Sequence, residues 1–69
     1  MSTIIKTLGK RIAKIRKNKG LTIEKLAYEN DLSKGNLSEI ERGLRDPKIT
    51  TLEKIAKGLE ISLGELFDF

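Results

Sequence analysis

The sequence contains no cysteine, no histidine and no tryptophan, and it has a single proline. Without cysteine there is no disulfide framework, and without cysteine and histidine the usual ligands of a zinc site are missing. The same absences remove the common thiol nucleophile and the common acid–base side chain of enzymes. The sequence also lacks a phosphate-binding loop of the G-x-x-x-x-G-K-[ST] kind. We therefore expect no enzymatic activity, no metal or other cofactor, and no small-molecule ligand.

Long apolar runs are also missing. No stretch approaches the roughly 20 apolar residues of a membrane span. Near the N-terminus, Ile4 and Ile5 are not followed by the apolar region of a signal peptide. These absences predict a soluble protein of the cytoplasm. The 69 residues are expected to form one domain, residues 1–69, of a size near the lower limit for folding alone. Its stability must come from well-patterned helices, helped by dimerisation.

Charge is present but unevenly distributed. The 14 basic and 10 acidic residues give a net charge of +4. Residues 1–20 hold seven of the bases and no acid, whereas residues 21–69 have seven bases and all ten acids, a net charge of −3. This asymmetry indicates that one side of the molecule meets a polyanion. The alternative is a lysine-rich helix face that is merely solvated.

Apolar residues that recur at steps of three and four indicate helices. One such stripe runs from Ile5 to Ile15, and Gly20 is expected to stop this first helix. Thr22 and Ser33 are expected to be the N-cap residues of a second and a third helix. These helices follow one another closely, with short connections.

The C-terminal part of the sequence predicts two more helices from capping-box spacing. Thr50 with Glu53 is expected to start a fourth helix, and Ser62 with Glu65 a short fifth one. No segment alternates between apolar and polar residues with the period of a strand. The sequence therefore predicts an all-α fold, a compact bundle of five helices.

Residues 22–42 have the spacing of a helix-turn-helix: a short capped helix, a turn of about four residues and a second helix. At 100° per residue, Leu37, Ile40 and Glu41 face one side of the third helix. Short and mostly uncharged side chains face the other side. Such a face suits the major groove of DNA, because it allows close approach while amides and lysine reach base edges. The alternative is an ordinary solvated face.

The segments IAKIRKNKGLT, EKLA, LSKGNLSEIERG, LEKIAKGLEIS and ELF follow one another between residues 8 and 67. In this combination, with Pro47 between the third and fourth, the chain resembles the phage-repressor-like (Cro/CI-type) helix-turn-helix domains of bacterial regulators. It is also similar, from residue 26 to 59, to the small controller proteins of restriction–modification systems. The resemblance implies the lambda-repressor-like five-helix fold. It further implies a sequence-specific, autoregulating transcription regulator that binds a two-fold operator in double-stranded DNA as a homodimer.

The resemblance also implies roles for single residues. An ion pair between Arg16 and Glu41 would tie the first helix to the third, and an inward carboxylate left unpaired would be costly. The implied base-reading residues are Lys34, Gly35, Asn36, Ser38 and Glu39. The implied phosphate contacts are Thr22, Ser33, Arg42, Arg45 and Lys48. The implied dimer surface, within residues 60–69, consists of Ile61, Leu63, Leu66, Phe67 and Phe69.

Three residues depart from the family pattern. Ile23 stands where the family often has glutamine, and it cannot bind the DNA backbone through its side chain. Gly35, at a principal base-reading position, offers only its backbone. Glu39 faces outward, where it repels phosphates but is able to accept from a cytosine amine. These departures leave a second hypothesis open, in which the same fold serves as a bridging or adaptor protein. At the C-terminus, Leu66 is also a candidate for closing the core of a monomer.

Overall fold

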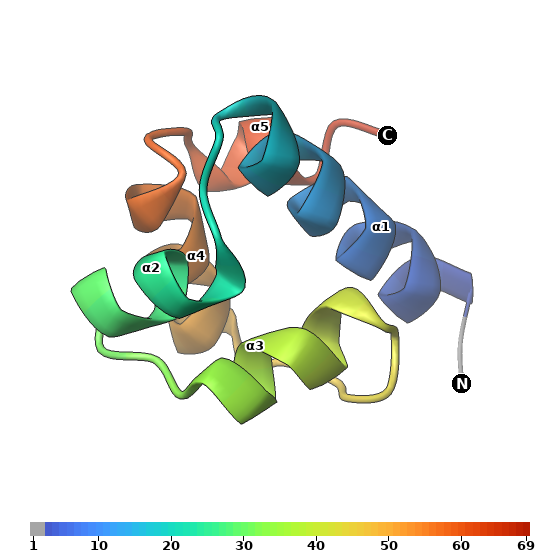
Figure 1. Cartoon of the computed structure of the whole chain (residues 1–69). Coiled ribbons are helices and arrows are strands. Elements are labelled where there is room, and N and C mark those ends of the chain that lie inside the picture. Colours follow the sequence, from blue (N-terminus) through green and yellow to red (C-terminus); the bar gives the residue numbers. More distant parts are fainter. Residues whose placement is uncertain (1–2) are drawn as a thin grey trace.

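The fold consists of five helices arranged around one core, in a computed structural model that describes residues 3–69 (Figure 1). The helices are α1 (Thr3–Asn18), α2 (Ile23–Glu29), α3 (Lys34–Glu41), α4 (Ile49–Gly58) and α5 (Leu63–Leu66). The predicted all-α bundle is confirmed, since the described residues contain no strand. No helix among these residues has the length and apolar character needed to cross a membrane.

Local hydrogen bonds fix where three of the helices begin. The hydroxyl oxygens of Thr22 and Ser33 each accept from a backbone N–H three residues later, at 3.0 Å. Ser62 and Glu65 form the expected capping box: the Glu65 N–H donates to the Ser62 hydroxyl at 3.1 Å, and the Ser62 N–H donates to the Glu65 carboxylate at 3.0 Å. These caps satisfy N–H groups that have no partner within the helix.

The expected start of the fourth helix is wrong. The N-cap of α4 is Lys48, and no capping box forms between Thr50 and Glu53. An N-cap residue needs an extended backbone, which Lys48 has with φ −69° and ψ 153°. Thr50 already lies inside the first helical turn, so its hydroxyl cannot fold back over the helix end. The helix therefore begins directly after Pro47 and Lys48, without a side-chain cap.

The core is built from aliphatic side chains of all five helices. Its buried members are Leu8, Ile12, Leu26, Ala27, Leu37, Ile40, Leu52, Ile55, Ala56, Leu59 and Leu66. Gly9 lets α1 approach α3, because a Cβ there would collide with the carbonyl oxygens of Ile40 and Glu41. Tight packing of α1 against α3 in this way fixes the orientation of α3 in the bundle.

Candidate nucleic-acid interface

The α2–turn–α3 unit is held rigidly by hydrogen bonds and by burial of one face of α3. In the turn, the Leu32 N–H donates to the Ala27 carbonyl at 2.9 Å. The Asn30 side chain donates to the Leu26 carbonyl at 2.8 Å, within part-buried surroundings. Leu37 and Ile40 of α3 are buried in the core. The opposite face of α3 is consequently turned to solvent, along the lower edge of the molecule in Figure 1.

Arg16 and Glu41 form the ion pair that the sequence led us to expect. Arg16 Nε lies 2.7 Å from Glu41 Oε2, and Arg16 Nη2 lies 3.0 Å from Glu41 Oε1. Both side chains are more than nine-tenths buried, with exposed fractions of 9% and 7%. The hydrogen bond that Arg16 donates to the Glu41 carboxylate raises the pKa of Arg16. Arg16 also donates to the Leu21 carbonyl at 2.8 Å, so that α1, its connection to α2 and the end of α3 are joined at one guanidinium.

Lys34, at the start of α3, is paired with a residue of α2. Its Nζ lies 2.9 Å from Glu24 Oε2, with both side chains well exposed. The hydrogen bond from Lys34 is the main reason that the pKa of Glu24 is lowered. Sequence reasoning did not find this pair, because only the angle between α2 and α3 brings the two residues together. The ion pair with Glu24 holds the Lys34 ammonium at the N-terminal end of α3.

A second surface pair lies farther along α3. Arg45 Nη2 is 2.7 Å from Glu39 Oε1, with both side chains partly exposed. The pair connects the outward face of α3 to the loop that leads to α4. Because Arg45 offsets the Glu39 charge, the repulsion expected between Glu39 and DNA phosphates is reduced. This pair was also missed, since Arg45 was expected only as a phosphate ligand.

Asn36 lies at the flank of α3 and not at the centre of its outward face. The residue is half-buried, and its Oδ1 is buried without a hydrogen-bond partner among the described residues. It borders a hollow of about 300 Å³ beside the α3–α4 loop, together with Arg45, Lys48 and Thr51. Lys34 and Gly35 are exposed, while Ser38 is partly covered. The outward face is therefore made chiefly by Lys34, Gly35, Ser38 and Glu39.

The residues expected to contact phosphates surround this face. Thr22 and Ser33 are exposed N-caps, and Lys48 is the exposed N-cap of α4. Arg42, at the end of α3, is exposed and donates from Nε to the Ser38 carbonyl at 3.4 Å. The structure thus brings cations and helix N-termini around α3.

The C-terminal apolar residues divide into buried and exposed members. Leu66 has an exposed fraction of 0%, so its side chain belongs to the core and is removed from the expected dimer surface. Ile61 and Leu63 are partly buried against the core. Phe67 and Phe69 are exposed, with ring centroids 6.3 Å apart. The family resemblance had placed Leu66 on that surface, and the sequence pattern does not separate a core side chain from an interface side chain.

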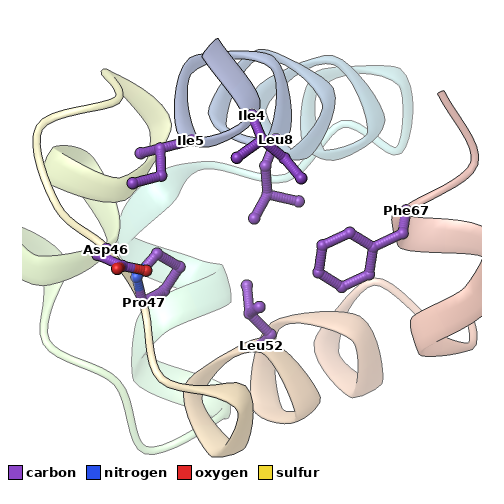
Figure 2. A pocket seen from close by; sticks show the side chains of 7 residues that line it. All are labelled: Ile4, Ile5, Leu8, Asp46, Pro47, Leu52 and Phe67. Carbon is purple, nitrogen blue, oxygen red and sulfur yellow. The ribbon is translucent and has the colours of Figure 1, made fainter. Parts of the chain in front are cut away.

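Sequence reasoning missed an apolar hollow next to these phenylalanines. Figure 2 shows Phe67 facing Ile4, Leu8 and Leu52 across this hollow, with Pro47 on the opposite side. Its volume is about 140 Å³. Ile4 has an exposed fraction of 56%. The exposed apolar surface therefore extends from the end of the chain to the start of α1.

Arg11 was also missed as a structural residue. Its Nη2 donates to the Glu65 carbonyl at 2.7 Å, and its Nε donates to the Leu66 carbonyl at 3.1 Å. Arg11 thus binds the C-terminal end of α5, where carbonyl groups lack helical partners. Nothing in the sequence pattern separates Arg11 from the neighbouring bases of α1.

Comparison with known proteins agrees with this geometry. A helix-turn-helix domain family matches residues 9–68. The chain is 41% identical to the control protein C.MunI from a Mycoplasma species, over 97% of this chain and 92% of that protein. It is 40% identical to the control protein C.BamHI of Bacillus amyloliquefaciens, over 88% of this chain and 76% of that protein. It is 45% identical to the transcriptional regulator SlrR of Bacillus subtilis (strain 168), but spans only 41% of that protein.

Solved structures show the same fold. The restriction-modification controller C.Esp1396I, a tetramer in complex with its natural 35-base-pair operator, superposes with a TM-score of 0.91. It is 41% identical, over 99% of this chain and 90% of that one. The controller C.AhdI from Aeromonas hydrophila gives a TM-score of 0.87 at 32% identity, over 90% of each chain.

Proposed function

Because this chain belongs to the helix-turn-helix domain family, we propose that it is a sequence-specific DNA-binding regulator of transcription that inserts α3 into the major groove. The observation that carries the proposal is the exposed face of α3. This face is held outward by the burial of Leu37 and Ile40 and by the Arg16–Glu41 pair. A Cβ added at Gly35 would meet no atom within 4 Å, so the first turn of this face is open to a close approach.

Base reading on this proposal falls to the expected residues of α3. Lys34 has the donors to bind the N7 and O6 atoms of guanine, and Glu39 accepts from the N4 amine of cytosine. Ser38 is able to donate or accept. At Gly35 the backbone itself approaches the bases. Asn36 reads an adenine only if its side chain turns out of the flank of α3, where its Oδ1 is buried.

Phosphate contacts fix the position of α3 in the groove. We assign them to Thr22, Ser33, Arg42, Arg45 and Lys48, the residues that surround its exposed face. Among these residues, Arg45 already forms an ion pair with Glu39. Contacts of this kind add affinity without sequence information.

We propose that the chain acts as a homodimer in the cytoplasm. A two-fold dimer presents two α3 helices to half-sites about one helical turn apart. The exposed Phe67 and Phe69, with Ile61 and Leu63 beside them, supply its apolar surface, and Ile4 extends it. Because the chain is 41% identical to the control protein C.MunI and covers 92% of it, we further propose an autoregulating controller of a restriction–modification system. Such a protein is not an enzyme.

The test is binding to the duplex that lies upstream of its own gene. We expect tight binding at low salt, a steep loss of affinity at high salt, and much weaker binding to a scrambled duplex. Lys34→Ala is expected to relax specificity at one base pair, at a cost of about 1–3 kcal/mol. Lys57→Ala, in the last turn of α4, is the matched control. A protein indifferent to every duplex would refute the proposal and favour the adaptor hypothesis.

A further inference from the structure

Helix α1 carries six cations and no acid. These cations differ in whether they have a partner in the structure. Arg16 is paired with Glu41, and Arg11 reaches the carbonyl groups at the end of α5. Lys10, Lys14 and Lys17 are exposed and form no ion pair with any described residue. Lys6 is likewise exposed and without an ion pair among the described residues, so the fold leaves four like charges unneutralised on α1. Lys10, Lys14 and Lys17 are the three that lie nearest its C-terminal end.

These three lysines share one face of α1. At 100° per residue they lie within roughly 60° of arc, and at 1.5 Å per residue they extend over about 10 Å. With Ala13, Asn18 and Glu41 they line a shallow hollow of about 400 Å³. Because Glu41 is the last residue of α3, the lysine face borders the end of the helix proposed to enter the groove.

The one acid in this hollow does not neutralise the lysines. Both Glu41 carboxylate oxygens accept from Arg16, and the side chain is 7% exposed. Arg11, rather than the three lysines, meets the end of α5 through the Glu65 carbonyl. The surface formed by Lys10, Lys14 and Lys17 is thus purely cationic toward solvent.

We propose that Lys10, Lys14 and Lys17 bind backbone phosphates of the DNA, beside the groove that α3 enters. This proposal rests on the proposed function, because the lysine face lies beside DNA only if α3 enters the groove. The walls of a groove are rows of phosphates, one per about 3.4 Å of axis on each strand, so 10 Å of lysines spans about three of them. These contacts add to those assigned around α3 and carry no sequence information.

The test compares two pairs of substitutions with the same spacing and the same charge change. Lys14→Gln with Lys17→Gln removes two members of the lysine face. Lys54→Gln with Lys57→Gln removes two exposed lysines of α4 that lie near Glu29 and Asp31. Glutamine has nearly the helix propensity of lysine, so both proteins are expected to fold. Circular dichroism and the urea midpoint check that they do.

Binding is measured at several salt concentrations on the upstream duplex and on a scrambled one. The slope of log affinity against log salt is expected to fall by about 1.8 for the Lys14/Lys17 pair, on both duplexes, because each phosphate contact contributes about 0.9. Between about 50 and 200 mM salt this variant then loses about twelvefold less affinity than the wild type. The Lys54/Lys57 pair is expected to keep the wild-type slope.

Three outcomes would overturn the proposal. An unchanged slope in the Lys14/Lys17 variant would show that these lysines do not touch phosphates, while leaving the proposed function intact. Equal reductions in both variants would show an effect of net charge alone. A wild-type protein that binds neither duplex would overturn the proposed function and this inference together.

Discussion

At the scale of single residues, the most informative position is Gly35, which has no side chain. Gly35 is exposed in the first turn of α3, and a Cβ there would meet no atom of the chain. Glycine costs up to about 1 kcal/mol of helix stability relative to alanine. Since the fold does not require glycine at this position, a close approach to DNA is the reason we assign to it.

Gly35→Ala separates these two effects. The variant is expected to be more stable than the wild type by up to about 1 kcal/mol, measured from urea unfolding. Its affinity for the specific duplex is expected to fall by about tenfold, equivalent to about 1.4 kcal/mol, because the added methyl group keeps the backbone from the bases. Raised stability with unchanged affinity would place DNA away from Gly35.

The Arg16–Glu41 pair is the second test at this scale. Removing one partner of a buried ion pair leaves the other charge uncompensated, which costs about 3–5 kcal/mol. We expect Glu41→Ala to lower the free energy of unfolding by that order, measured in urea. Glu24→Ala breaks the exposed pair with Lys34 and is the control, with little expected effect. Similar losses in both variants would contradict the structural role of the buried pair.

At the scale of the elements, the sequence predicted those features that depend on neighbours along the chain. Thr22, Ser33 and the Ser62–Glu65 box are local, and all three caps are present. The capping box at Thr50 failed because Thr50 lies within the first turn of a helix whose start is set by the preceding loop. The pairs of Lys34 with Glu24 and of Arg45 with Glu39 depend on how elements pack, which periodicity does not report.

The capping box of α5 makes a pH-dependent prediction. The hydrogen bond from the Ser62 backbone is the main cause that lowers the pKa of Glu65 below its ordinary value of 4.5. A carboxyl group whose pKa is lowered by folding stabilises the fold above its unfolded pKa, and this stabilisation is lost as the pH falls through the folded pKa. Glu65→Gln is expected to remove that part of the acid dependence of unfolding, measured between pH 6 and about pH 3. Identical acid profiles for both proteins would refute the role of Glu65.

At the scale of the whole molecule, charge and apolar surface lie on different parts of the bundle. Lys10, Lys14 and Lys17 of α1 border the end of α3, whereas Phe67, Phe69 and Ile4 form an exposed apolar surface around the two ends of the described chain. A small monomer rarely leaves such a surface uncovered unless it binds something. Separate surfaces of these two kinds allow the chain to bind DNA and a second copy of itself at the same time.

The last prediction concerns this apolar surface. Phe67→Ser with Phe69→Ser is expected to convert the proposed dimer to a monomer that remains folded, measured by sedimentation over a range of protein concentrations. Tyr28→Ser, at an aromatic side chain that is 90% exposed on α2, is the control and is expected to stay dimeric. Leu66→Ala is expected to act differently, since Leu66 is fully buried. It should lower the free energy of unfolding by about 2–5 kcal/mol by leaving a cavity in the core. A double phenylalanine variant that remains dimeric would move the dimer surface elsewhere, and the two-fold spacing of the operator would then have to be set by another face of the bundle.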